Sequence, residues 1–345
     1  MSQESADAAG GPPRRERHPA DRALRATHPV LLMNPRSGGG TVTRYRLGDR
    51  CRDLGVEAVV LHPGDDLVEL AESAVARGSD LLGMAGGDGS QALVASVAAR
   101  HGVPFVVVPA GTRNHFARDL GVGTGVVGSL SAFVDGVDVR VDLAEVNGRV
   151  FVNNASMGAY AELVRSPGYR EAKVRTAVEL LPELVGPSAA PADLRYALPG
   201  GERATTAQVL LVSNNPYRLS GPPQGAGRPR LDSGLLGVVS VRVPGRAEAE
   251  RLAALDAAGH SERFPGWHEW TTNELDVASG QPVALGVDGE AVTLEAPLHF
   301  VTRPGALVVR IARARLPRRS MPLPAGAASP SPFTALSRLA SGRGA

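Results

Sequence analysis

The sequence predicts a mixed α/β protein, with a sheet of parallel strands in its first half and a β-rich unit in its second half. Through the first half, short apolar runs alternate with amphipathic helical stretches, and glycine-rich loops follow the runs. In the second half, Asn147-Gly148 separates two strand-like runs, and this dipeptide suits the type I′ turn of a hairpin.

Four apolar runs predict the strands of the parallel sheet. They are His28–Asn34, Ala58–Leu61, Asp80–Met84 and Pro104–Pro109. Helices are expected after the first run, to about Leu54, and after the third run, where Val94 and Val97 mark one. Between the second and third runs, apolar residues with helical spacing predict one face of a helix: Leu67, Leu70, Ala71, Ala74 and Val75.

The second half contains further strand signals and one helix signal. Strands are expected on both sides of Gly200-Gly201, over Leu235–Val243 and over Asn273–Val277, with a helix over Ala172–Leu184. A last strand over Ala306–Ala312 is a candidate to return to the first domain, which the sequence alone does not decide.

The composition narrows the functional classes. The 345 residues carry a net charge of +2, and only 4% are aromatic, which argues against a stacking platform for nucleic acid. No apolar run is long enough to span a bilayer, and the N-terminus lacks the apolar stretch of a signal peptide. A single cysteine, Cys51, fits a reducing compartment. We therefore expect a cytoplasmic protein that binds no nucleic acid. Its oligomeric state is left open, a homodimer included.

Both ends of the chain, residues 1–27 and 313–345, are polar, contain proline and lack periodicity, so we expect disordered tails. The second tail is rich in arginine and has no acidic residue. A solvated tail is one interpretation. The other is peripheral contact with the anionic inner face of a membrane, worth ~1 kcal/mol per basic residue near the lipid.

Three glycine-bearing loops follow apolar strands: Asn34–Gly40 (NPRSGGG), Gly86–Ser90 (GGDGS) and Ala110–Asn114 (AGTRN). The carboxyl ends of parallel strands share one edge of the sheet, so these loops should converge on one crevice. Their amides can bind phosphate beside helix N-termini. Asp88 would repel phosphate unless a divalent cation lay between them, which points to Mg²⁺.

Two familiar nucleotide motifs do not account for these loops. A P-loop needs Gly-Lys-Ser/Thr, which the chain lacks. Residues 123–128 match GxGxxG, but no strand precedes them, so a connection between helices is favoured. Downstream, Val287–Glu290 (VDGE) carries two carboxylates, although local sequence alone favours a surface turn.

Five blocks, in this order and spacing, resemble the diacylglycerol kinase catalytic-domain family, the bacterial soluble lipid kinases related to sphingosine kinases. The resemblance covers roughly Val30 to Ile311, most of the chain. The blocks are NPRSGGG, GGDGS, Pro109–Gly121, Val152–Gly158 (VNNASMG) and VDGE. The resemblance implies an N-terminal parallel-sheet domain like those of NAD kinases and phosphofructokinases, followed by a β-sandwich-like domain.

The resemblance also implies a reaction and a site. ATP and Mg²⁺ would serve transfer of the γ-phosphate to a lipid hydroxyl, with diacylglycerol as the default acceptor. Glu290 would be the general base, Asp88 the partner of Mg²⁺ or phosphate, and Asp288 would orient the site or the metal. The implied nucleotide-binding residues are Asn34, Pro35, Arg36, Ser37, Gly38, Gly86, Gly87, Asp88, Gly89, Ser90, Gln91, Ala92, Gly111, Thr112 and Asn114.

The chain departs from the family pattern at several positions. Ala92-Leu93 stand where the family often has Asn-Glu, and His115 stands where it usually has Asp. Ser233 replaces an aspartate of an accessory Mg²⁺ site, and Asp232, one residue earlier, is the remaining candidate ligand. Two alternatives therefore stay open. One is a kinase of a soluble acceptor, like the NAD kinases, and the other is a catalytically silent nucleotide-binding regulator.

The expected organisation has five parts. A disordered lead-in covers 1–27, a nucleotide-binding α/β domain 28–141 and a β-rich acceptor domain 142–297. Strand residues 298–312 and the basic, proline-rich tail 313–345 complete the chain.

Overall fold

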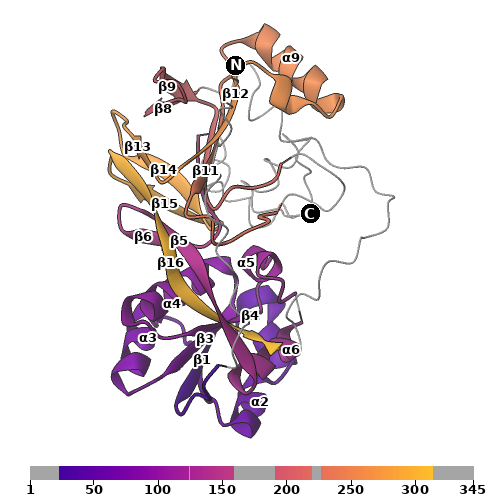
Figure 1. Cartoon of the computed structure of the whole chain (residues 1–345), viewed down its shortest axis with the longest axis vertical. Helices are drawn as coiled ribbons and strands as arrows, with labels where there is room; N and C mark the ends of the chain where they lie inside the picture. The colour runs from indigo at the N-terminus through magenta and orange to yellow at the C-terminus, as the bar shows by residue number, and fades with distance from the viewer. Residues whose placement is uncertain (1–22, 124, 159–190, 220–226, 314–345) are drawn as a thin grey trace, which may run out of the picture.

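A computed structural model describes residues 23–123, 125–158, 191–219 and 227–313 (Figure 1). Most of both predicted tails and the helix expected over Ala172–Leu184 lie outside these ranges. The mixed α/β class is confirmed, because a sheet whose first strands are parallel is joined to separate antiparallel sheets.

The first part of the main sheet is parallel, with strand order β2-β1-β3-β4. Its strands are β1 (Pro29–Met33), β2 (Glu57–Val60), β3 (Leu81–Gly86) and β4 (Phe105–Pro109). Strands β1, β3 and β4 are buried along their whole length, as their continuous apolar sequences predict. The loops that follow these three strands therefore leave the same edge of the sheet.

Helices cover both faces of these strands. On one face, Val30 and Leu32 pack with α3 (Leu67–Ala76) and α4 (Asp88–His101). On the other, Leu31 and Met33 pack with α2 (Leu47–Leu54), α6 (Val126–Ser129) and the 3₁₀ turn Leu130–Phe133. Two shorter helices, α1 (Thr41–Arg44) and α5 (His115–Asp119), follow the loops after β1 and β4.

Two long strands connect this core to a second one (Figure 1). β16 (Leu298–Ala312) lies parallel to β4 near Val309 and pairs antiparallel with β5 (Gly136–Val146). The register of this pair shifts between Arg303 and Leu307. Val141 of β5 and Leu307 and Val309 of β16 pack in the first core. The other ends of the two strands pack in the second core, through Val146 and Phe300.

The second core lies between two layers of β-structure. One is the sheet β12-β11-β10-β7-β14-β15, and the other is formed by the upper ends of β5 and β16 with β6 (Arg149–Phe151) and β13 (Glu274–Val277). Phe151 and Phe300 meet edge to face between them, with ring centroids 6.5 Å apart. The strands of the first layer are β7 (Asn154–Gly158), β10 (Val209–Asn214), β11 (Leu236–Val241), β12 (Trp267–Thr272), β14 (Val283–Val287) and β15 (Glu290–Leu294).

The predicted hairpin at Asn147-Gly148 is confirmed, as are the strands predicted on both sides of Gly200-Gly201. Asn147 and Gly148 join β5 to β6 with φ angles of 47° and 80°, the left-handed backbone that a type I′ turn requires. Gly200 and Gly201 separate β8 (Ala192–Ala197) from β9 (Arg203–Ala207). One further helix, α9 (Arg246–Ala257), follows β11. In the described part of the chain, every helix is too short or too polar to cross a membrane.

Candidate active site

The three glycine loops touch one another through their backbones. A methyl group built on Gly38 would lie 2.3 Å from the carbonyl oxygen of Ala110, and one built on Gly111 would lie 2.4 Å from the Cα of Gly87. The amide of Asn34 donates to the carbonyl of Ala85, 3.0 Å away. Only residues without a side chain allow such approaches. The glycines therefore bring the ends of β1, β3 and β4 into one cradle.

Asp88 is the first residue of α4, and its carboxylate faces the third loop. Its two oxygens accept the amides of His115 and Phe116, each at 3.1 Å. These amides open α5, so the short helix holds the carboxylate in a fixed orientation. Each oxygen keeps a lone pair for a further ligand, because a carboxylate can accept about four hydrogen bonds.

Asp288 lies in the turn between β14 and β15, beside the second core, and is partly buried. Its oxygens accept the amides of Val152, Asn153 and Asn154 at 2.8 to 3.1 Å. Burial raises the pKa of this carboxyl to about 7, the three amides oppose the shift, and the negative charge of Asp88 adds to it. Asp288 and Gly289 have φ angles of 47° and 84°, so this turn is left-handed too.

Glu290 follows the turn and reaches the second glycine loop. A methyl group on Gly89 would lie 2.3 Å from its Oε1 atom. Arg149 on β6 donates to its other oxygen across 3.4 Å, but the two side chains are 35% and 48% exposed, so the pair adds little stability. The guanidinium of Arg113 lies beside Gly289. The structure therefore brings the VDGE turn against the GGDGS loop, which local sequence did not predict.

Some of the predicted nucleotide-binding residues are exposed to solvent, and others are buried beneath the loops. Asn34, Pro35, Arg36, Ser37, Gly38 and Thr112 are partly or fully exposed around the cradle. Gln91 is buried and donates to the carbonyls of Met84 and Val108, at 2.8 and 3.1 Å, and Ala92 packs in the first core. Asn114 bonds to the amide and the carbonyl of Gly111. These three side chains support the cradle from inside, and a role of these residues in nucleotide binding stays a prediction.

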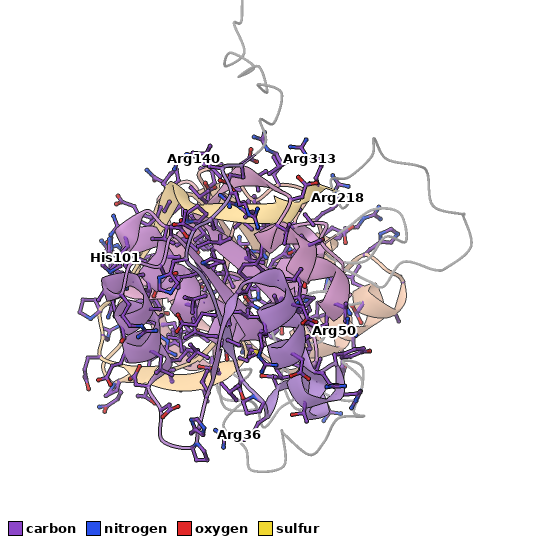
Figure 2. The ribbon with its side chains drawn as sticks, turned by 90° about the horizontal axis from the view of Figure 1, so that it is seen from below. Arg36, Arg50, His101, Arg140, Arg218 and Arg313 are labelled. Atoms are coloured by element: carbon purple, nitrogen blue, oxygen red, sulfur yellow. The ribbon has the colours of Figure 1, made fainter. Side chains whose placement is uncertain are left out.

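Exposed cationic side chains lie all around the molecule in Figure 2, with Arg36 on the side opposite to Arg140 and Arg313. Asp232, the predicted accessory metal ligand, bonds to Arg230 at 3.0 Å on the surface. Within the described ranges, no three His, Cys, Asp or Glu side chains gather as a metal site would require. A cation at Asp88 would thus need other ligands, such as substrate phosphates.

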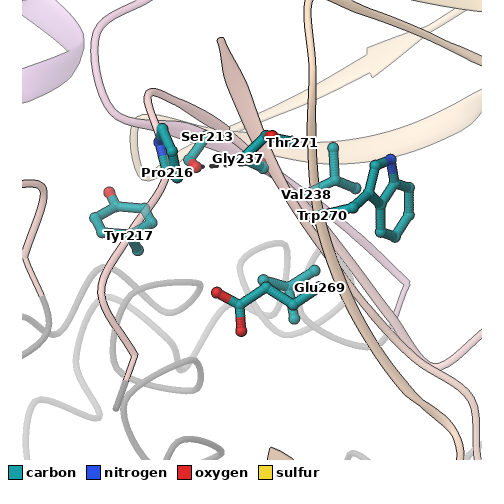
Figure 3. Close-up of a pocket in the computed structure, with 9 residues that line it drawn as sticks. Ser213, Pro216, Tyr217, Gly237, Val238, Glu269, Trp270 and Thr271 are labelled. Atoms are coloured by element: carbon teal, nitrogen blue, oxygen red, sulfur yellow. Dashed lines mark hydrogen bonds between the residues drawn. The ribbon is translucent and has the colours of Figure 1, made fainter. Parts of the chain in front are cut away.

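A cavity of about 440 Å³ opens on the sheet formed by β10, β11 and β12 (Figure 3). Its lining residues include Tyr217, Val239, Glu269 and Trp270. The hydroxyl of Tyr217 accepts a hydrogen bond from the side-chain amide of Asn154 at 3.1 Å, and the backbone amide of Asn154 binds Asp288. The cavity is therefore connected to the VDGE turn through a single residue.

Comparisons with known proteins agree with this architecture. Residues 28–146 match the model of the diacylglycerol kinase catalytic domain. A Staphylococcus aureus protein named diacylglycerol kinase is 26% identical over 239 residues, which span 66% of this chain and 73% of that protein.

Solved structures from Bacillus anthracis share the fold. A candidate diacylglycerol kinase superposes with a TM-score of 0.65 at 17% identity, over 85% of this chain and 98% of that one. A second structure, described as a diacylglycerol kinase, gives 0.56 at 16% identity, over 85% and 100%. Residues 28–146 are thus similar to a diacylglycerol kinase catalytic domain, and the chain shares the fold of these solved structures.

Proposed function

We propose that this protein transfers the γ-phosphate of ATP to a lipid hydroxyl, with diacylglycerol as the default acceptor. The observation that supports this most is the meeting of the glycine cradle with Asp88, Asp288 and Glu290, which come from both cores. Phosphoryl transfer needs mainly positioning and charge neutralisation, and this set supplies both.

The cradle would bind the phosphates of ATP. Backbone amides of the loops and the N-terminus of α4 favour negative charge, and the absence of side chains at Gly38 and Gly111 lets the loops lie close enough to bind one phosphate chain together. Asp88 fits a Mg²⁺ ion, because its oxygens retain lone pairs and this ion usually takes one or two carboxylates together with substrate phosphates. When bound, the ion would neutralise charge on the phosphates.

Glu290 would act as the general base. Its carboxylate lies above Gly89, at the start of α4, where an acceptor hydroxyl could approach a bound phosphate. Glu290 would take the hydroxyl proton as the acceptor oxygen bonds to the γ-phosphorus and the bond to the bridging oxygen of ADP breaks. Asp288 would hold the turn that carries this base.

The cavity beside Tyr217 is the candidate site for the acceptor. Its 440 Å³ and its mixture of Trp270, Val239 and polar groups are ordinary for a ligand pocket. Because the proposed acceptor is a membrane lipid, the enzyme would work at a membrane surface as a peripheral protein.

Purified protein incubated with labelled ATP, Mg²⁺ and vesicles that contain single candidate lipids provides the test. A labelled lipid is expected, with diacylglycerol vesicles giving the strongest signal. Labelled product from NAD or another soluble acceptor, and none from any lipid, would replace the lipid proposal. ATP binding with no product from any acceptor would favour a regulator.

A further inference from the structure

One buried cation lies between the two acidic parts of the site. Arg228 precedes β11, and its side chain is fully buried. Its Nε donates to Asp119 at 2.7 Å, its Nη2 to the side chain of Asn153 at 2.7 Å, and its Nη1 to the carbonyls of Val152 and Asn214. The guanidinium also lies 5.5 Å from the centre of the Tyr217 ring.

The first of these contacts leads to Asp88. Asp119 is the last residue of α5, and the first two amides of α5 hold the Asp88 carboxylate. The helix has only five residues, so its two ends move together. Arg228 therefore anchors one end of a rigid element whose other end orients Asp88.

The second set of contacts leads to Asp288. Arg228 binds the carbonyl of Val152 and the side chain of Asn153, while Asp288 binds the amides of the same two residues. The segment between β6 and β7 is thus held from both sides, by the guanidinium of Arg228 and by the carboxyl group of Asp288. A shift of Arg228 would release this segment and the turn that ends in Glu290.

We propose that Arg228 is a positioning residue for phosphoryl transfer. It fixes the position of the Asp88 carboxylate relative to the Asp288 carboxyl group, and these groups lie beside different cores. This inference rests on the proposed function. A small displacement of reacting groups can lower the rate about 10²-fold, so the relative position of these two groups affects catalysis directly. Stability alone is a weak explanation for Arg228, because well-packed apolar residues often replace a buried ion pair without loss.

The test compares two paired substitutions in the full chain. Arg228→Met with Asp119→Leu removes the buried pair without leaving an unpaired charge. Arg310→Met with Asp138→Leu is the matched control, because Arg310 is also nearly buried and forms two bonds to Asp138, at 2.7 and 2.9 Å, away from the site. Arg228→Lys, which keeps the charge but loses the fork of donors, is the third variant.

We expect the first pair to lower kcat by about 10²-fold while KM for ATP changes little, and the control pair to leave kcat near the wild-type value. Arg228→Lys should fall between the wild-type protein and the first pair. A folded Arg228→Met/Asp119→Leu protein with wild-type kcat would overturn the proposal.

Hydrogen exchange gives a readout that needs no lipid product. In the first pair, the amides of His115, Phe116 and residues 152–154 should exchange faster than in the wild-type protein, while the amides of β1 and β3 should not change. If the wild-type protein phosphorylates no lipid, the proposed function fails, and this measurement still decides the positioning role. Unchanged exchange at these five amides would refute it.

Discussion

The carboxylate of Glu290 lies so close to the Cα of Gly89 that a single added methyl group would meet its Oε1 atom at 2.3 Å. Gly89 belongs to α4 in the first core, and Glu290 to β15 in the second. The contact between these two residues is the closest link in the site between the glycine cradle and the proposed base.

Gly89→Ala should therefore displace Glu290 and lower kcat, by about 10²-fold for a shift near 1 Å, with ATP binding retained. Steady-state kinetics and calorimetric ATP titration check this. Gly48→Ala is the matched control, since Gly48 also lies in a helix and a methyl group there meets nothing within 4 Å. A wild-type kcat in Gly89→Ala would show that the reaction does not depend on the contact between Glu290 and Gly89.

Glu290→Gln should reduce transfer by about 10² to 10⁴-fold, because the amide cannot accept the hydroxyl proton. Affinity for ATP with Mg²⁺ should not change, as the cradle is intact. The measurement is lipid phosphorylation together with ATP binding. Glu295→Gln, which alters an exposed carboxylate at the end of the same hairpin, should have no effect. Full activity in Glu290→Gln would require a different base.

Gly111→Ala should weaken nucleotide binding more than it slows transfer at saturating ATP. The methyl group would meet the Cα of Gly87 at 2.4 Å and the side chain of Asn114 at 2.9 Å, so the second and third loops must separate. A higher KM for ATP and a weaker calorimetric affinity are expected. Unchanged affinity would mean that ATP binds outside the cradle.

Asp288 should make the stability of the protein depend on pH. Burial raises the pKa of its carboxyl to about 7, above the value of 3.8 expected for an exposed aspartate. The folded state thus resists ionisation, and its free energy of unfolding should fall as pH rises from about 4 to about 7. Each pKa unit of the shift corresponds to about 1.4 kcal/mol, and partial exposure of Asp288 reduces the loss.

Urea unfolding near pH 5 and near pH 8 tests this, with Asp288→Asn as the comparison. The variant cannot ionise, so its stability should decline less than that of the wild-type protein over the same range. Its absolute stability is less informative, because the amide replaces an oxygen that accepts the Val152 amide. If the free energy of unfolding falls equally in both proteins between these pH values, the pKa of Asp288 is not raised.

Much of the first core was predictable because its signals are local. Apolar runs followed by glycines set the parallel strands, and Asn147-Gly148 set the first hairpin of the second half. The VDGE turn was different. Its local sequence is that of any charged turn, and only the family resemblance marked it as functional before the structure brought it to Gly89.

Other site residues carry no local signal. Arg228 has hydrogen-bond partners 14 to 109 residues away, so no short motif marks it. Gln91 follows a glycine motif, and its buried side chain donates to the carbonyls of Met84 and Val108, contacts that no local pattern predicts. Both outcomes depend on how distant segments pack.

The pairing of β16 with β4 and β5 has a consequence during synthesis. About 190 residues separate the end of β4 from the start of β16. A ribosome that adds roughly 5 to 20 residues per second would need on the order of 10 to 40 seconds to make them. For that time β4 has an unpaired edge, which can bind another strand or a chaperone until residues 298–312 emerge.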